Sequence, residues 1–372
     1  MKLNRALRSI INRTVFYLSK IFIFTFRYAS PKWPFRTLLK YVPSSVLTLG
    51  DKLASRSIDQ SVLSQPGRGS IGLIIESGAL KIILLNMMAK ERLGLSKLIC
   101  YDERKKNWNE AGMLEELAKD DETKVIIMCL ESIRSGRQFM HVARDISKKK
   151  PIIVLKSGKS RVGARAVMSH VGFLAGADEI CNAAFKQSGI LRAQTIEDVL
   201  DFAKALSFQT TAKGSRIAIL TNGGGAGIVA ADACLGKGLE VPSLSRSVQK
   251  CFRRKIPLFS GTTNPLDLRA SATAEVYANA INCLLVSDDV DLIMLMVYPT
   301  PALDINRFVS LVLKLQRKLT KPLVVCGTGS EKFINRLLIL ERSHIPVYIL
   351  PERAVSGAAA LVYFGRVQGK IK

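Results

Sequence analysis

The chain has 372 residues, of which 48% are hydrophobic and 23% are charged. A chain of this length suits two domains and can bury substantial cores, which excludes a mostly disordered protein. Its 55 lysines and arginines outnumber its 30 acidic residues, and the net charge of +25 is extreme for a soluble enzyme. No zinc-finger or RNP signature accompanies this charge, so the sequence argues against nucleic acid as a partner.

Residues 1–50 are basic and contain no acid, and an apolar run at 14–26 is interrupted by Lys20. This run is too short to cross a bilayer, because a membrane-spanning helix needs about 20 apolar residues. The segment instead resembles an organellar transit peptide or an interfacial helix on a membrane surface, and an unselected extension is the plain alternative. We therefore expect a basic extension at 1–66, in a protein of the cytoplasm, an organellar matrix or the membrane periphery.

The seven cysteines are spread along the chain, mostly in apolar runs, and none forms a CxxC pair or has a histidine close by. This pattern argues against a disulfide scaffold and against a zinc site. We expect reduced core thiols in an intracellular protein, and no metal site.

From residue 69 onward, short runs rich in Ile, Val and Leu alternate with longer amphipathic stretches. This alternation predicts an α/β fold with doubly wound parallel sheets. The runs form two sets that match each other in order, and 72–79, for example, pairs with 217–224. The sequence therefore predicts two tandem flavodoxin-like domains, at 67–207 and 208–372. The expected strands are 70–75, 97–101, 124–130, 151–155 and 189–193, then 216–221, 238–244, 292–297, 322–326 and 346–350.

In such sheets ligands bind at the carboxyl ends of the strands, so the loops there are the candidate sites. The first strand is followed by Ser77, a suitable N-cap, and by Gly78 and Ala79, which leave backbone amides open to an anion. Such a turn can cradle phosphate, or it can simply let a helix pack closely on the sheet. In the second domain the corresponding turn is glycine-rich and contains Asn222, Gly223, Gly224 and Gly225.

Another helix start with exposed amides is expected after the Gly/Thr-rich loop that ends in Asn264 and Asp267. Ala272 and Thr273 begin that helix, with Thr273 as its cap. In the functional interpretation this helix terminus faces the ligand crevice of the second domain, and an ordinary turn and cap is the alternative.

His170 is flanked by small residues in a basic, Gly- and Ser-rich loop that follows a buried strand. An imidazole there can act as a nucleophile or base near neutral pH, although exposed loop histidines are common. Glu131 ends the strand 124–130 on the same sheet, where a carboxylate can orient and stabilise an imidazole. A solvated strand-end acid is the alternative.

The segment 139–190, with Ser169-His170-Val171-Gly172 at its centre, closely resembles the nucleoside-diphosphate-forming acyl-CoA synthetases. This superfamily includes ADP-forming acetyl-CoA synthetase and succinyl-CoA synthetase. The resemblance covers roughly 67–370 in family order, and it extends through 77–80, Glu131, 221–225, 264–267 and 351–354.

The resemblance implies an acid–thiol ligase in which acyl-CoA and ADP exchange phosphate through an acyl phosphate and a phosphohistidine. His170 matches that histidine, which a swinging loop carries, and Glu131 matches the carboxylate that supports it. The helices that begin near Gly78 and Thr273 match the pair whose amino termini hold the phosphate. The loops expected to face the nucleotide or the partner contain Asn222, Gly223, Gly224, Gly225, Asn264 and Asp267.

The chain also departs from the family pattern. Residues 1–66 are too short for the CoA-binding Rossmann domain, the ATP-grasp module is not recognised, and Glu76 replaces the usual Gln, where a carboxylate would repel an anion. We therefore expect an ATP-grasp subunit and a CoA site in trans, with CoA, ATP or ADP and Mg bound only with those partners, and a small carboxylate or acyl-CoA as substrate. The alternative is a catalytically degenerate member that binds or scaffolds a partner, at a membrane through residues 1–50.

Overall fold

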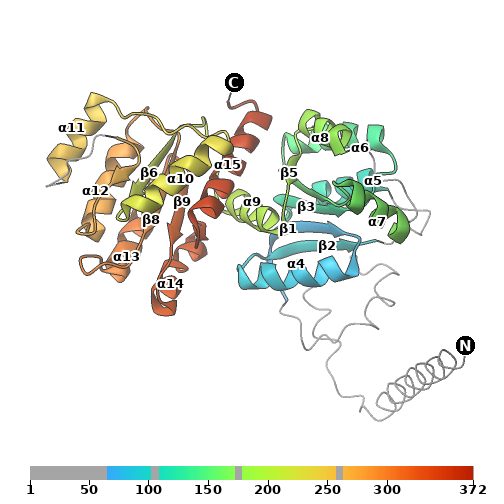
Figure 1. Ribbon diagram of the computed structural model, residues 1–372, viewed down its shortest axis with the longest axis horizontal. Coiled ribbons are helices and arrows are strands. Elements are labelled where there is room, and N and C mark those ends of the chain that lie inside the picture. The colour runs from blue at the N-terminus through green and yellow to red at the C-terminus, as the bar shows by residue number, and fades with distance from the viewer. Residues whose placement is uncertain (1–64, 102–108, 172–177, 257–262, 372) are drawn as a thin grey trace, which may run out of the picture. The chain divides into compact units, whose positions relative to one another are not determined.

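The structure is a computed structural model that describes residues 65–101, 109–171, 178–256 and 263–371. In this part of the chain, two five-stranded parallel sheets are flanked by helices, as Figure 1 shows. The first sheet has the strand order β2-β1-β3-β4-β5, and the second has the order β10-β9-β8-β6-β7. When the strands are numbered within each half, both sheets have the flavodoxin-like order 2-1-3-4-5, so the predicted fold class is confirmed.

Strands and helices alternate along both halves of the described chain, as the apolar runs predict. The first half consists of β1 (Arg68–Ile75), α4 (Gly78–Lys90), β2 (Leu95–Cys100), α5 (Glu110–Lys119), β3 (Val125–Leu130), α6 (Gly136–Ser147), β4 (Ile152–Lys156), α7 (Arg161–Val171), α8 (Asp178–Gln187), β5 (Leu191–Ala193) and α9 (Ile196–Phe208). The second half consists of β6 (Ile217–Thr221), α10 (Gly224–Gly236), α11 (Arg246–Lys255), β7 (Leu266–Asp267), α12 (Ala274–Leu285), β8 (Leu292–Val297), α13 (Ile305–Gln316), β9 (Leu323–Gly327), α14 (Glu331–Leu337), η2 (Leu340–Ser343), β10 (Val347–Tyr348) and α15 (Pro351–Val367).

The central strands β3 and β8 are buried along their whole length. Successive side chains point to opposite faces of a strand, so Ile126 packs in one core cluster and Ile127 in the other. Helices cover both faces of each sheet, which is why these strands are continuous apolar runs rather than alternating ones. This continuity made them easy to predict.

The prediction of a strand at 238–244 is wrong. There the chain makes only an isolated bridge between Arg216 and Glu240, and β7 fills the edge position of the second sheet instead. Gly238 lies in the left-handed region at φ 71°, where it ends the turn after α10. Pro242 then lacks the N–H that a sheet ladder needs, so the apolar run cannot pair as a strand.

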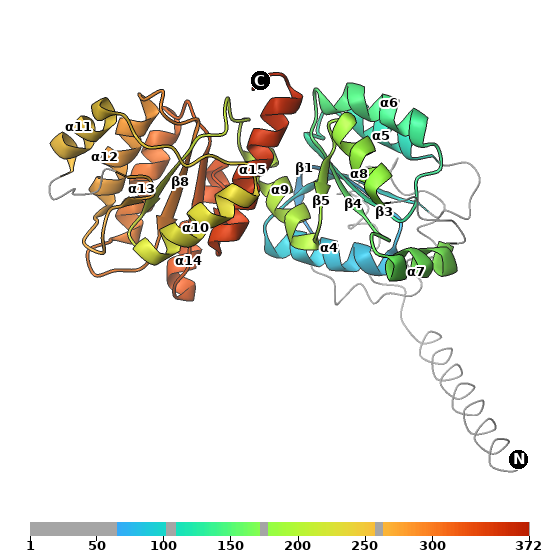
Figure 2. The same cartoon turned by 45° about the horizontal axis from the view of Figure 1, so that its top comes forward.

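The two halves pack against each other through their last helices, α9 and α15 (Figure 2). One buried cluster continues from Leu84 and Met88 of α4 through both of these helices to Ala230 and Cys234 of α10. The hydroxyl of Tyr348 also donates to the carbonyl oxygen of Asp201 across this junction (3.0 Å). In the described part of the chain, the two sheets therefore share one buried cluster.

The expectation that all cysteines are reduced is wrong for one pair. Cys251 of α11 and Cys283 of α12 form a disulfide, with their Cα atoms 6.0 Å apart. The two residues are 32 positions apart, and only the packing of α11 on α12 brings them together. The remaining cysteines are free thiols, namely Cys100, Cys129, Cys181, Cys234 and Cys326. Among the described residues, no group of three or more His, Cys, Asp and Glu side chains could hold a metal ion.

The acid-free N-terminal segment lies outside the described residues, which begin at residue 65. Over the described ranges, no helix combines the length and the apolar character needed to cross a bilayer. The membrane or transit role expected for residues 1–50 stays a prediction.

Candidate functional site

The first sheet has a topological switch point where β1 and β3 end side by side. The helix after β1 packs on one face, through Leu84, and the helix after β3 packs on the other, through Phe139. Doubly wound sheets bind their ligands at such a point. Glu76 follows β1 and Glu131 follows β3, and the register pairs Ile75 with Cys129. Two carboxylates therefore flank the switch point.

A buried lysine fixes the backbone beside this edge. Lys156, at the end of β4, is 4% exposed, and its Nζ donates to the carbonyl oxygens of Glu131 (2.6 Å) and Ser157 (2.7 Å). The Ser157 amide in turn donates to the carbonyl oxygen of Leu130 (2.9 Å). Lys156 is not among the residues predicted from the sequence, although a lysine at the end of a buried strand is a usable signal, since lysine is rarely buried without partners.

The amino terminus of α4 begins at the switch point and is open. The Ser77 hydroxyl accepts from the Leu80 amide (3.4 Å), so the predicted N-cap is confirmed. The first turn contains no acid, and a Cβ placed on Gly78 would meet nothing within 4 Å. Glu76 stands just before this terminus, and its carboxylate accepts from the Tyr101 hydroxyl (3.4 Å). The free amides and the helix dipole together favour an anion here.

His170 lies in a helix and not in the predicted loop. It is the last residue but one of α7, which follows β4. The helix starts well, because the Ser160 hydroxyl accepts from the Gly163 amide (3.0 Å) and no proline interrupts the segment. The segment 172–177 that follows His170 lies outside the described residues. The roles expected for His170 and Glu131 stay predictions.

The second sheet has the same switch point, between β6 and β8, and one asparagine locks it. Asn222 is 4% exposed; its Nδ2 donates to the Tyr298 carbonyl (2.8 Å), and its Oδ1 accepts from the Tyr298 amide (2.9 Å). Thr221, the last residue of β6, pairs with Met296, just as Ile75, the last residue of β1, pairs with Cys129. Asn222 is therefore the structural equivalent of Glu76 in the first half. The repeat deduced from the sequence, which places Thr221 opposite Glu76, is therefore one residue out of register. Asn222 thus holds the backbone at the carboxyl edge of the second sheet, and both of its amide atoms are hydrogen-bonded.

Asn264 also uses its side-chain amide to bond the backbone, here that of β6. Its Oδ1 accepts from the Ile219 amide (3.0 Å), and its Nδ2 donates to the Ile217 carbonyl (2.7 Å), beside the cis peptide bond to Pro265. The side chain thus takes the place of a neighbouring strand. As with Asn222, we find a structural use for a residue that was expected to face a ligand, and the ligand role stays a prediction.

Asp267 lies against the amino terminus of α10. A Cβ on Gly224 would come within 3.0 Å of its Oδ2, and its Oδ1 accepts from the Arg269 amide (2.8 Å). A carboxylate is stabilised by the positive end of a helix. Gly223 and Gly225 complete the turn, so the glycines let an acid approach the helix start as closely as an anionic ligand would.

The terminus at Ala272 and Thr273 has a different setting. It follows β7, the edge strand, and α12 begins without a capping hydrogen bond from Thr273. Glu275 already occupies its first turn and pairs with Arg307 (2.8 Å). The structural counterpart of α4 is therefore α10, which starts at the switch point of its own sheet.

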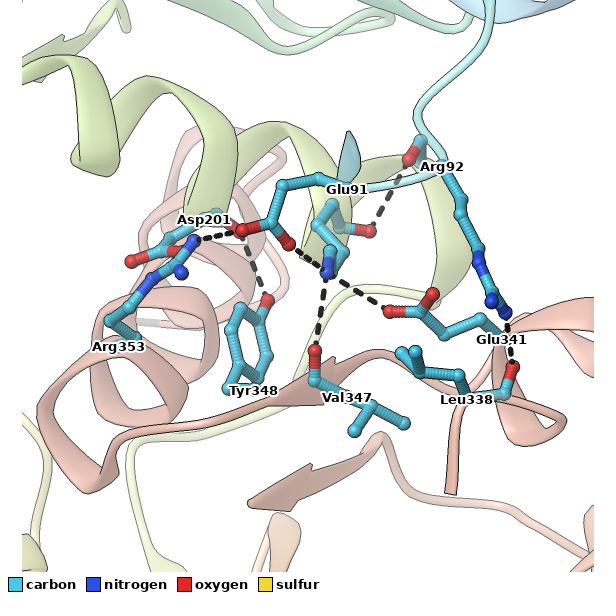
Figure 3. A network of polar contacts seen from close by, with 10 residues as sticks. Glu91, Arg92, Asp201, Leu338, Glu341, Val347, Tyr348 and Arg353 are labelled. Atoms are coloured by element: carbon cyan, nitrogen blue, oxygen red, sulfur yellow. Dashed lines mark hydrogen bonds and ion pairs between the residues drawn. The ribbon is translucent and has the colours of Figure 1, made fainter. Parts of the chain in front are cut away.

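A buried cluster of charges joins the two halves, and sequence reasoning missed all of it (Figure 3). Lys204 of α9 is 1% exposed. Its Nζ lies 2.5 Å from Glu91 Oε2, 2.9 Å from Glu341 Oε1 and 3.2 Å from the Val347 carbonyl oxygen. One lysine therefore links the end of α4 to η2 and β10 of the other half.

Arg353 supplies the second cation of this cluster. Its Nη2 lies 2.7 Å from Asp201 Oδ1 and 3.0 Å from Glu91 Oε1. Burial raises the pKa of Asp201 to about 6 and also raises that of Glu341. At Glu91 burial acts in the same direction, but the Lys204 and Arg353 cations outweigh it and lower the pKa. Three carboxylates thus share two cations.

The ion pair between Glu91 and Arg353 has a counterpart between the two halves, in which the acidic and the basic residue have exchanged places. Glu91 caps the end of α4 and pairs with Arg353, the third residue of α15. Lys237 caps the end of α10 and lies 3.5 Å from Asp198, the third residue of α9. Two copies of the first half would bring Glu91 to Asp198, and like charges repel. The exchanged charges therefore favour packing of a first half on a second half over packing of two first halves.

Protein-family profiles match both halves of the chain. One, described as a succinyl-CoA ligase like flavodoxin domain, matches residues 68–206, and another, described as a ligase-CoA domain, matches residues 217–356. The solved structure of dinucleotide forming acetyl-coenzyme A synthetase 1 from Ca. Korarchaeum cryptofilum, in complex with phosphate and ADP, has a TM-score of 0.77 and 32% identity, covering 84% of this chain and 67% of that one. The chain belongs to the nucleoside-diphosphate-forming acyl-CoA synthetase family.

Curated acyl-CoA synthetases of this family are longer than the part that matches. Acetate–CoA ligase (ADP-forming) I subunit alpha of Pyrococcus furiosus is 37% identical over 306 residues, which covers 82% of this chain and 66% of the relative. Acetate–CoA ligase (ADP-forming) I of Archaeoglobus fulgidus is 34% identical over 305 residues, covering 82% of this chain and 43% of the relative. The chain thus spans about two thirds of one relative and less than half of the other.

Proposed function

We propose that this chain is the phosphate-relaying subunit of an acyl-CoA synthetase. The observation that carries the proposal is the open, acid-free amino terminus of α4 at a switch point that Glu131 flanks, in a chain of this family. Phosphate first displaces CoA from the acyl-CoA and forms an acyl phosphate. His170 then takes the phosphoryl group and releases the carboxylate. Finally ADP takes the phosphoryl group from His170 and becomes ATP.

The residues of this chain have separate tasks in the transfer. Glu131 orients the imidazole of His170 and stabilises its positive charge when it carries phosphate. The amides of Gly78 and Ala79, fixed by the Ser77 cap, bind the phosphoryl oxygens. Phosphoryl transfer needs positioning and positive charge more than covalent machinery, which suits a site made of helix amides.

For the second phosphate-binding terminus we favour Gly224 over Thr273. Its support is the internal repeat, since α10 follows the first strand of its sheet as α4 does. The Asn222–Tyr298 pair then holds this terminus in place. Asp267, which lies against Gly224, moves away or is screened when an anion binds, because two negative charges at one helix start repel.

CoA and nucleotide binding belong to partners in this proposal. An ATP-grasp subunit and a CoA site act in trans, and CoA, ADP or ATP and Mg bind with them. Support comes from the relative named as a subunit alpha and from the matched two thirds of its length. The substrate is a small carboxylate or its acyl-CoA. Residues 1–50, basic and free of acid, attach the assembly peripherally to a membrane surface.

The test uses the chain purified from its native source together with its companions, treated with Mg-ATP labelled in the γ-phosphate. We expect an acid-labile, alkali-stable label on the wild-type chain, no label on His170→Ala, and full label on His141→Ala, whose histidine lies within α6. An unlabelled wild-type chain in a preparation that contains a nucleotide-binding companion would overturn the relay and favour the scaffold role.

A further inference from the structure

A cationic hollow that the proposed relay does not use lies mainly on the second half, with Arg92 of the first half in its lining. Two adjoining hollows of about 620 and 680 Å³ lie over α13, α14 and η2, and they share Arg336 and Ile339. We refer to them together as the α13–α14 groove. Its cations are Arg92, Lys314, Arg317, Lys332, Arg336 and Arg342.

The charges of the α13–α14 groove are not neutralised within the described chain. All six cations are exposed, and no carboxylate among the described residues lies within 4.0 Å of any of them. Glu331 is the one acid in the lining, and Arg92 donates only to the Leu338 carbonyl oxygen (3.4 Å). Six like charges gathered on one surface repel one another, so an anionic occupant gains a large Coulomb attraction there.

The first hollow has apolar side chains among its cations, together with Asn306 and Ser310. Val309, Leu313 and Ile339 face the first hollow, and Lys314, Arg317 and Arg336 stand around them. A bare phosphate ion would leave this apolar surface uncovered. An occupant that places aliphatic groups between its negative charges would cover it and gain from the burial.

The openness of the groove favours a polypeptide over a small polyanion. A site for a small ligand typically occupies about 300–1,000 Å³ and buries most of its ligand. Each hollow alone has a volume within that range, but every cation of the groove is exposed, so a small ligand would remain largely in contact with solvent. We propose that the α13–α14 groove binds an acidic segment of a partner protein, in which Asp or Glu residues alternate with aliphatic ones. This inference does not depend on the phosphate relay.

The test measures binding of a short fluorescent peptide made of alternating glutamate and leucine pairs to the full chain by anisotropy. The groove variant carries Arg317→Glu and Arg336→Glu. The matched control carries Arg253→Glu and Arg254→Glu, which change the same charge on the exposed face of α11, where neither hollow extends. Thermal unfolding of both variants confirms that they fold.

We expect the groove variant to bind at least about tenfold more weakly, because two exposed charge pairs become repulsive, and the control to change less than about twofold. Binding should also weaken with added salt, and a glutamine–leucine peptide should not bind. Equal weakening in both variants, or binding of the neutral peptide, would overturn the proposal. Complete displacement of the peptide by ATP or inorganic phosphate at stoichiometric concentration would assign the groove to a small anion instead.

Discussion

Replacing Lys204 with methionine tests the buried cluster between the two halves. The substitution keeps most of the side-chain length and removes the charge that Glu91 and Glu341 share. Glu91 keeps Arg353 as a partner, but Glu341, which is 5% exposed, loses its cation. Breaking a buried ion pair costs about 3–5 kcal/mol, because the remaining charge stays buried without compensation. Burial raises the pKa of Glu341, and loss of the Lys204 cation raises it further.

The assay is urea unfolding at pH 7, followed by circular dichroism, with Lys237→Met as the matched control. Lys237 takes part in the other charged contact between the halves; its side chain is 41% exposed and lies 3.5 Å from Asp198, so its loss should cost only about 0–1 kcal/mol. Adding Glu341→Gln to Lys204→Met should restore part of the stability, since no unpaired charge then remains on that residue. Equal losses for the two lysine variants would refute the reasoning.

The remaining predictions concern pH, the second switch point and the disulfide. Burial raises the pKa of Asp201 from 3.8 to about 6, so the folded state binds this proton more tightly than the unfolded state. Wild type should therefore gain stability relative to Asp201→Asn as the pH falls from 7 to about 4, in urea unfolding at each pH. Asn222→Ala removes both hydrogen bonds to Tyr298 and should lower the free energy of unfolding by about 1–3 kcal/mol, seen as a lower melting temperature. Cys251→Ser should cost about 2–4 kcal/mol, and alkylation of the denatured, unreduced wild type should label two fewer thiols than after reduction.

Local features of this fold could be predicted because their causes are local. The strands β3 and β8 are apolar along their length since both faces of a parallel sheet are covered, and that continuity is visible in the sequence. Ser77 was predictable as a cap because its hydroxyl bonds an amide only three residues away. The switch-point positions of Glu76 and Glu131 follow from the strand ends once the sheet order is assumed.

Features that depend on packing between distant segments could not be predicted. Lys204 finds Glu341 and Val347 only when α9 docks on the other half, and no sequence period marks such a pair. Cys251 and Cys283 meet because two helices pack together. The helical setting of His170 was hidden by glycines and serines, which usually indicate a loop.

The central claim is that His170 accepts phosphate, and the half-reaction with acyl phosphate tests it most directly. That step involves neither CoA nor nucleotide, so it uses this chain without its partners. Acetyl, butyryl and phenylacetyl phosphate, each carrying labelled phosphorus, are incubated with the wild type, His170→Ala and His344→Ala, and the labelled residue is located by mass spectrometry. The account predicts phosphohistidine at His170 in the wild type and in His344→Ala, and none in His170→Ala. Label that persists in His170→Ala, or a wild type that all three reagents leave unlabelled, would contradict it.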